Sequence, residues 1–149
     1  MQVTDSIRSV LDYKGHEIFC VEPEASVYEA LQIMADKEIG ALLVVSGGKL
    51  TGLLSERDYA RKVILMGRSS RETPVEEIMS VPVICASPKD SVDECMRLMT
   101  VNRVRHLPVT QGEQIMGIVS IGDLVNWIIT AQSETIDHLS NYIAGSYPG

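Results

Sequence analysis

The feature that most constrains the fold of this sequence is an internal repeat. When the chain of 149 residues is shifted against itself by 65 positions, residues 18–59 align with residues 83–124 without a gap. Twelve of the 42 aligned pairs are identical, whereas chance matching at ordinary residue frequencies would give about 2–3. Many other pairs exchange one apolar residue for another, as at Ile33 and Leu98. The chain is therefore predicted to fold as two copies of one structural unit.

Each copy is predicted to form a strand, a helix, two strands and a second helix. The first strands are expected at Glu17–Val21 and Pro82–Ala86. The segments Ser26–Glu29 and Ser91–Glu94 then have the spacing of capping boxes, and apolar residues recur behind both at helical intervals. Glycine-containing turns are expected to join the remaining strands as hairpins. These strands are Ala41–Val45 with Leu50–Leu54, and Leu107–Thr110 with Ile115–Val119.

The remaining segments complete the predicted organisation. An extra helix is expected at Thr4–Tyr13, and a last helix from about Asp123 to Ile143. The expected divisions are a first unit at 4–66 with the N-terminal helix, a polar linker at 67–74, and a second unit at 75–143 with the C-terminal helix. A unit of roughly 45 residues is too small to be stable alone. We therefore expect an α/β (α+β) fold in which the two units pack sheet to sheet about a pseudo-twofold axis, with two equivalent clefts between them.

Composition and charge exclude several classes of protein. A hydrophobic content of 45% excludes a disordered chain. The longest apolar stretches are too short to span a bilayer, and the start of the chain does not have the pattern of a signal peptide. The three cysteines fit reduced thiols in a cytoplasm, and Cys20 and Cys85 are expected as small core residues. A net charge of −7 argues against nucleic acid and anionic membranes as partners.

The most informative motif is the end of each copy, Gly52–Asp58 and Gly117–Asp123. Both segments read Gly, two apolar residues, Ser, two further residues and Asp. One interpretation is a capping box, with the Ser as N-cap and the Asp at the third helical position. The other is a ligand site, in which amides at the helix start favour a phosphate and the carboxylate binds ribose hydroxyls. Both remain open, because a capping Ser can also donate its hydroxyl to a ligand.

Two copies in register that both end in this motif resemble the tandem cystathionine-β-synthase (CBS) domain pair, or Bateman module. The segments Ile39–Val45 and Arg105–Val109 are also similar to that family, and the resemblance covers about residues 4 to 130. It implies a stand-alone module that pairs into homodimers and binds an adenosyl ligand in its clefts: AMP, ADP, ATP, NAD(H) or S-adenosylmethionine. It also implies that the protein senses a ligand and regulates an unknown partner protein, rather than acting as an enzyme.

The resemblance assigns roles to particular residues. Asp58 and Asp123 would hold ribose hydroxyls, Ser55 and Ser120 would lie beside the ribose or phosphate, and the chain near Ile18 and Val83 would face the adenine. The loop before the second strand would contribute further contacts. The full set of ligand-binding positions that the resemblance implies is Ile18, Gly40, Ala41, Ser55, Arg57, Asp58, Val83, Arg105, His106, Leu107, Pro108, Ser120 and Asp123.

The two copies differ at several of these positions. Arg105 and His106 can pair with a phosphate, whereas the first copy has Gly40 and Ala41 in their place. Conversely, Arg57 is replaced by a glycine in the second copy. The two clefts are therefore expected to differ in affinity and in ligand preference. The sequence leaves open which cleft Arg105 faces.

Other interpretations have weaker support in the sequence. His16 and Cys20 lack a second pair of ligands, so we predict no metal site. The motifs of phosphate-binding loops, dinucleotide folds, zinc proteases and serine hydrolases are absent from the sequence, which disfavours a hydrolase or transferase. Lys14 and the pair Arg61 and Lys62 could approach a phosphate or simply be solvated. A protein–protein interaction module without a ligand remains the alternative.

Overall fold

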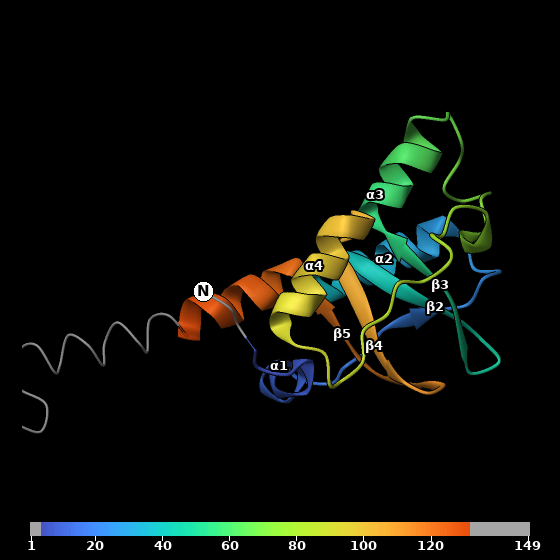
Figure 1. Ribbon diagram of the computed structural model, residues 1–149. Helices are drawn as coiled ribbons and strands as arrows, with labels where there is room; N and C mark the ends of the chain where they lie inside the picture. The colour runs from blue at the N-terminus through green and yellow to red at the C-terminus, as the bar shows by residue number, and fades with distance from the viewer. Residues whose placement is uncertain (1–3, 132–149) are drawn as a thin grey trace, which may run out of the picture.

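The computed structural model describes residues 4–131. The elements in chain order are α1 (Ile7–Lys14), β1 (Cys20–Val21), α2 (Val27–Lys37), β2 (Ala41–Ser46), β3 (Lys49–Ser55), α3 (Glu56–Tyr59), the π-helix η1 (Ala60–Ile64), the 3-10 helix η2 (Val75–Glu77), α4 (Val92–Asn102), β4 (His106–Gln111) and β5 (Gln114–Ser120). Residues 121–131 form a further helix. The arrangement confirms the predicted mixed α/β fold with two related units (Figure 1).

The first copy forms a three-stranded sheet in the order β1-β2-β3. Strand β1 runs parallel to β2, and β2 runs antiparallel to β3. Helix α2 begins at Ser26, whose side chain accepts a hydrogen bond from the Glu29 backbone N–H. Its buried side chains, Val27, Ala30 and Met34, pack on the apolar face of this sheet. The expected capping box is only half formed here, because the Glu29 carboxylate does not accept a hydrogen bond from the Ser26 backbone N–H.

The second copy has a two-stranded sheet, and its expected first strand at Pro82–Ala86 is wrong. Only a single parallel bridge joins Ala86 to Val109. The first copy shows why, since the Leu43 N–H donates to the Phe19 carbonyl oxygen at 3.2 Å. The repeat-equivalent residue of Leu43 is Pro108, which has no N–H to donate. The ladder is therefore one hydrogen bond shorter. By contrast, the capping box of Ser91 and Glu94 at the start of α4 is complete.

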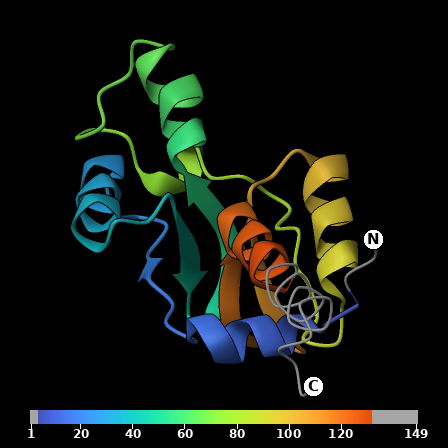
Figure 2. The same ribbon diagram turned by 90° about the vertical axis from the view of Figure 1, so that its left-hand side faces the viewer.

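The segment preceding each copy packs into the core of the other copy. Helix α1 precedes the first copy in the chain, yet Ile7, Val10 and Leu11 lie in the core of the second copy. The segment that precedes the second copy behaves in the same way, because Val75 and Ile78 lie in the core of the first. Figure 2 shows α1 (dark blue) beneath the sheets, near the orange-red helix of residues 121–131. Each half thus depends on the other for a complete core.

The glycine of the repeated motif makes this exchange possible. A Cβ atom at Gly117 would lie 2.8 Å from Cδ2 of Leu11, closer than real contacts allow. A Cβ atom at the equivalent Gly52 would overlap the side chain of Met79. At both positions an exchanged segment crosses close over the strand, so a larger residue there would force the side chain of Leu11 or Met79 to shift.

A third apolar cluster lies between the two sheets. Its buried members are Ala41, Leu43 and Leu53, and Ile18, Val83, Ile115 and Ile118 are among the partly buried residues packed against them. Residues from both copies meet in it, so the predicted sheet-to-sheet packing is observed. Sequence reasoning was wrong about Cys20, which is exposed rather than part of the core.

The first and last helices of the described residues lie close to their predicted positions. The predicted N-terminal helix is observed as α1, ending one residue later than expected. The predicted last helix is observed over residues 121–131, and its expected continuation to Ile143 lies outside the described residues. Between residues 4 and 131, no helix is both long and apolar enough to cross a membrane.

Candidate ligand-binding clefts

Two clefts lie between the copies, and most of their lining positions correspond at the 65-residue offset. The Asp58 cleft, of ≈ 640 Å³, is lined by Gly40, Leu53, Ser55, Glu56, Arg57, Asp58, Arg61, Lys62, Ser80, Pro82, Ile84, Asn102, Arg103, Val104, Arg105 and His106. The Asp123 cleft, of ≈ 900 Å³, is lined by Lys14, Gly15, Glu17, Phe19, Asp36, Lys37, Glu38, Ile39, Gly40, Ala41, His106, Ile118, Ser120 and Asp123. Both are large enough for a nucleoside-sized ligand.

Each cleft is built from both copies. The Asp58 cleft combines the Ser–Asp motif of the first copy with the loop at Arg105 and His106 of the second. The Asp123 cleft combines the motif of the second copy with Gly40 and Ala41 of the first. This geometry answers the question that the sequence left open, since Arg105 faces Asp58 rather than Asp123.

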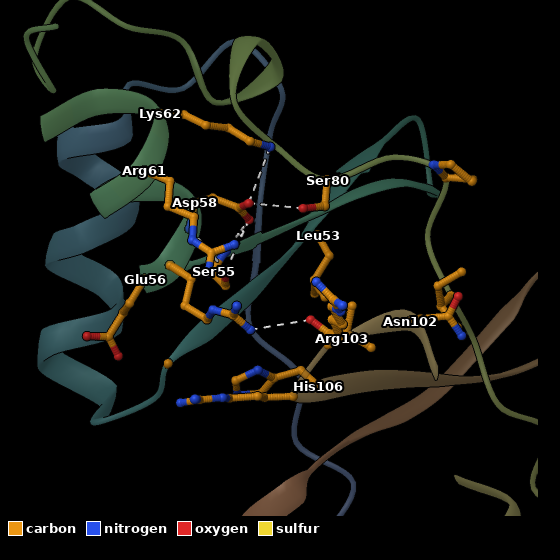
Figure 3. Close-up of a pocket in the computed structure, with 16 residues that line it drawn as sticks. Leu53, Ser55, Glu56, Asp58, Arg61, Lys62, Ser80, Asn102, Arg103 and His106 are labelled. Atoms are coloured by element: carbon orange, nitrogen blue, oxygen red, sulfur yellow. Dashed lines mark hydrogen bonds and ion pairs between the residues drawn. The ribbon is translucent and has the colours of Figure 1, made fainter. Parts of the chain in front are cut away.

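Asp58 lies nearly buried at the inner end of its cleft, with 8% of its surface exposed. One carboxylate oxygen, Oδ2, accepts hydrogen bonds from the backbone N–H and the hydroxyl of Ser55, at 3.0 and 3.1 Å. The other, Oδ1, accepts from the Ser80 hydroxyl at 3.0 Å and pairs with the Lys62 ammonium at 3.3 Å. Figure 3 shows these three partners around Asp58, with Arg103 and His106 across the cleft. The carboxylate is therefore held in one orientation.

Asp123 occupies the equivalent place in the other cleft with a different cation. Its Oδ2 accepts from the Ser120 N–H at 2.8 Å and from the Lys14 ammonium at 2.6 Å. Lys14 comes from α1 and also donates to the Ile118 carbonyl oxygen at 2.8 Å. Burial alone would raise the pKa of Asp123, but the hydrogen bonds from Lys14 and Ser120 outweigh it and lower the pKa. The carboxyl group is thus held ionised.

Three backbone amides at the start of each motif helix already have hydrogen-bond acceptors within the protein. In the Asp58 cleft the N–H of Ser55 donates to Asp58, and the N–H of Asp58 donates to the Ser55 hydroxyl. The N–H of Glu56 donates to the Gly40 carbonyl oxygen at 3.1 Å. The same three bonds recur in the second copy, where the N–H of Ile121 donates to the Arg105 carbonyl oxygen. A phosphate would therefore not be bound by these three amides unless their present hydrogen bonds were broken.

His106 and Gly40 border both clefts. A Cβ atom at Gly40 would lie 3.5 Å from the imidazole Cε1 of His106 and 3.1 Å from a carboxylate oxygen of Glu56. Burial lowers the pKa of His106, and the nearby Lys14 and Arg105 act in the same direction, while Asp123 opposes them. The imidazole is therefore neutral at pH 7, and it supplies a flat polar surface at the boundary between the clefts.

Four of the expected ligand positions do not line either cleft. Ile18 and Val83 pack in the cluster between the sheets, and their neighbours Phe19 and Ile84 line the clefts in their place. Leu107 and Pro108 are buried in the strand β4. Adjacent side chains of an extended segment point to opposite faces, so Ile18 and Val83 face away from the clefts that Phe19 and Ile84 line.

Sequence reasoning also missed residues that line the clefts. Arg103 and Glu38 occupy equivalent positions at the ends of α4 and α2, and both face a cleft. Aligning the copies charge by charge could have identified them. Ser80 had no comparable signal, since its bond to Asp58 spans 22 positions in sequence. Among residues 4–131, no group of three or more His, Cys, Asp or Glu side chains could hold a metal ion.

The structure is thus a duplicated unit with two composite clefts, each of which carries a Ser–Asp capping box. The chain belongs to the CBS domain family, since the sequence model of the CBS domain matches residues 10–64 and again residues 75–130. It is 40% identical over 138 residues to the "CBS domain-containing protein CBSX3, mitochondrial" of Arabidopsis thaliana, an alignment that covers 89% of this chain and 66% of that relative. The chain therefore spans slightly less than two thirds of that relative's length.

Solved structures agree with this assignment. A "putative signal-transduction protein with CBS domains" from Burkholderia ambifaria is 48% identical, with a TM-score of 0.83, covering 86% of this chain and 96% of its own. A more distant structure, the CBS domain pair of protein MJ0100 in complex with 5′-methylthioadenosine and S-adenosyl-L-methionine, shares the fold at 24% identity and a TM-score of 0.76, covering 86% and 98% of the two chains. The chain thus contains a tandem pair of CBS domains.

Proposed function

We propose that this protein is a sensor that binds an adenine nucleotide (AMP, ADP, ATP or NAD(H)) between its two CBS units and does not turn it over. The observation that carries the proposal is Asp58, a nearly buried carboxylate at the inner end of a cleft. A buried carboxylate is costly unless it is fully hydrogen-bonded, and Ser55, Ser80 and Lys62 meet that requirement. The hydroxyls of a ribose could replace those of Ser55 and Ser80 as donors to the ionised oxygens.

The surroundings of Asp58 fit the rest of such a ligand. Apolar side chains, Leu53, Ile84 and Val104, provide the surface against which a purine ring can pack. Arginines at the same cleft provide charge for a phosphate. Binding would join the motif of one copy to the loop of the other. A ligand that prefers one relative placement of the two copies would shift the shape that a partner protein recognises.

The test is a panel of AMP, ADP, ATP, NAD, NADH and S-adenosylmethionine in thermal shift, followed by calorimetry. A ligand at 100 times its dissociation constant should stabilise the fold by about 2.7 kcal/mol per site. Asp58→Asn, which keeps the side-chain volume, should abolish binding in the Asp58 cleft. Glu113→Gln, in the exposed turn of the β4–β5 hairpin, serves as the matched control. Absence of binding by every adenosyl ligand would overturn the proposal.

The second candidate is a protein–protein interaction module whose clefts hold no ligand. One observation favours it: the Ser and Asp of both motifs are engaged with each other, as capping alone requires. This candidate predicts that Asp58→Asn and Asp123→Asn lower stability while no adenosyl ligand affects the wild-type melting temperature. The ligand panel therefore separates the two candidates in a single experiment.

We propose further that the protein acts in the cytoplasm as a homodimer and regulates a separate protein, with neither nucleic acid nor membrane as a partner. Exposed apolar side chains support a dimer, because Ile64, Leu65 and Met66 are 56%, 77% and 70% exposed at the end of η1. Sedimentation of the protein with and without nucleotide tests this directly. A monomer under both conditions would contradict the dimer.

A further inference from the structure

The two clefts carry opposite charge. The lining of the Asp58 cleft has five arginine or lysine side chains and two carboxylates, a formal excess of three positive charges. The lining of the Asp123 cleft has two lysines and four carboxylates, a formal excess of two negative charges. The whole chain has a net charge of −7, so the positive cleft runs against the overall balance. The two clefts are formed by equivalent segments of the two copies, yet they present different electrostatic environments to a ligand.

The difference in charge is clearest at a pair of equivalent residues that have the same backbone conformation. Arg103 ends α4 and Glu38 ends α2, both in the left-handed conformation with φ of 55° and 54°. The two residues are repeat-equivalent, and each faces its own cleft. A cation in one copy therefore replaces an anion in the other without any change in local conformation. Arg57 and Arg105 add to the contrast, since both of their equivalents are glycine.

The arginines of the Asp58 cleft are available to a ligand, whereas its lysine, Lys62, is paired with Asp58. Among residues 4–131, no ion pair involves its four arginines (Arg57, Arg61, Arg103 and Arg105). Arg57 Nη1 instead donates to the Arg103 carbonyl oxygen at 3.3 Å, which links the two sides of the cleft (Figure 3). In the other cleft Lys14 is paired with Asp123, and Lys37 lies over the Phe19 ring at 5.3 Å. The remaining carboxylates there, Glu17, Asp36 and Glu38, would repel a phosphate.

We propose that the two clefts select different chemical classes of adenosyl ligand by charge. The Asp58 cleft takes a nucleotide with phosphates, and the Asp123 cleft takes an adenosyl compound without phosphate, neutral or cationic. Arginine pairs with phosphate through two parallel hydrogen bonds, whereas a carboxylate near a phosphate costs energy unless a cation intervenes. The inference rests on the proposed function, because it assumes that the adenosyl part binds in both clefts.

The test is calorimetry on the full chain with ADP and with adenosine. Wild-type protein should bind one ADP per chain, and protein saturated with ADP should still bind one adenosine. Arg103→Glu should weaken ADP binding by about tenfold or more, which corresponds to the loss of one charge-assisted contact. Glu38→Arg should create a second ADP site. Each substitution places in one copy the residue that the other copy already carries at the same φ, so folding should be preserved.

The possible failures are distinguishable. If neither ADP nor adenosine binds and no other ligand of the panel binds either, the proposed function fails and the inference fails with it. If both compounds bind but wild-type protein takes two ADP molecules with equal affinity, the inference is overturned and the proposed function stands. The same holds if Arg103→Glu leaves ADP affinity unchanged while its adenosine binding is intact. Glu113→Gln should behave as wild type in every titration.

Discussion

The two copies share what the backbone requires and differ where a ligand would meet side chains. Both keep a glycine under the exchanged segment, a Ser–Asp box at the helix start and a left-handed residue at the end of a helix. The charges around these shared features are opposite in the two clefts. Residues that a fold needs and residues that a ligand needs can therefore be separated within one chain, because the second copy acts as an internal reference for the first.

The comparison also shows how tightly the copies depend on each other. Leu11 of α1 is 1% exposed in the core of the second copy, although it precedes the first copy in the chain. Leu11→Ala should therefore destabilise the protein by about 2–5 kcal/mol, the usual cost of a large core truncation. Urea unfolding measures this loss. Hydrogen exchange should accelerate in β4 and β5 more than in β2, and equal acceleration in both sheets would show that the halves unfold as one unit.

Arg8→Ala is the matched control for this experiment. Arg8 lies on the same helix as Leu11 and is exposed, so its loss changes the helix surface without opening a cavity. Its effect should fall within about 0.5 kcal/mol of wild type. A similar loss of stability in both variants would mean that helix formation in α1, rather than core packing, limits stability.

The next largest effect is expected at the paired glycines. Gly117→Ala places a methyl group against Leu11, and Gly52→Ala places one against Met79. Overpacking of this kind costs about 1–3 kcal/mol. Met79→Ala should reduce the cost of Gly52→Ala, because it removes the side chain that the new methyl group would overlap. A double-mutant cycle measures that coupling, and purely additive effects would contradict the proposed crossing contact.

Much of the fold could be predicted from the sequence, because a repeat makes each copy a check on the other. The helices α2 and α4 and both hairpins were predicted from periodicity and turn residues. The missing strand near Pro82 was not, although Pro108 carried the reason. Pro108 has no N–H to donate to the first strand, and this loss can be recognised only when the strand that pairs with Pro108 is known. The packing of α1 on the second copy was also beyond local patterns, since it joins Leu11 to Gly117 across the chain.

The candidate site was predicted in part for the same reason. The Ser–Asp motifs line the two clefts, and the structure places Arg105 in the same cleft as Asp58. Ile18 and Val83 lie outside the strands that form, so the direction of their side chains could not be predicted, and Phe19 and Ile84 line the clefts instead. Lys14 and Ser80 reach the two carboxylates from distant segments. Contacts of this kind come from tertiary structure and have no local signature.

A smaller effect should distinguish the capping of the two first helices. The Glu94 side chain accepts from the Ser91 N–H at 3.4 Å, whereas Glu29 makes no such bond to Ser26. Glu94→Ala should therefore cost about 0.5 kcal/mol more than Glu29→Ala, the lower end of the range for a net hydrogen bond. Both residues interact alike with the helix dipole, so that contribution cancels. Denaturant midpoints at equal protein concentration measure the difference, and identical losses would show that the longer bond contributes nothing.

The most subtle difference between the copies is expected in pH dependence at His106, whose equivalent in the first copy is Ala41. Burial lowers the pKa of His106 in the folded protein from its ordinary value of 6.5. As the pH falls through 6.5, the unfolded chain takes up a proton that the folded protein does not, so stability is lost until the folded pKa is reached. His106→Ala, which installs the residue of the first copy, should flatten this loss between pH 7.5 and 5.5.

His16 provides the opposite sign for the same experiment. Its hydrogen bonds to the Met116 carbonyl oxygen and to Asp12 raise its pKa, so it contributes stability below pH 6.5 that is lost as the pH rises through the folded value. His16→Ala should therefore steepen the loss of stability on acidification, whereas His106→Ala reduces it. Urea midpoints of the three proteins across this range measure both slopes. A steeper loss in His106→Ala would contradict the lowered pKa of His106, and a flatter loss in His16→Ala would contradict the raised pKa of His16.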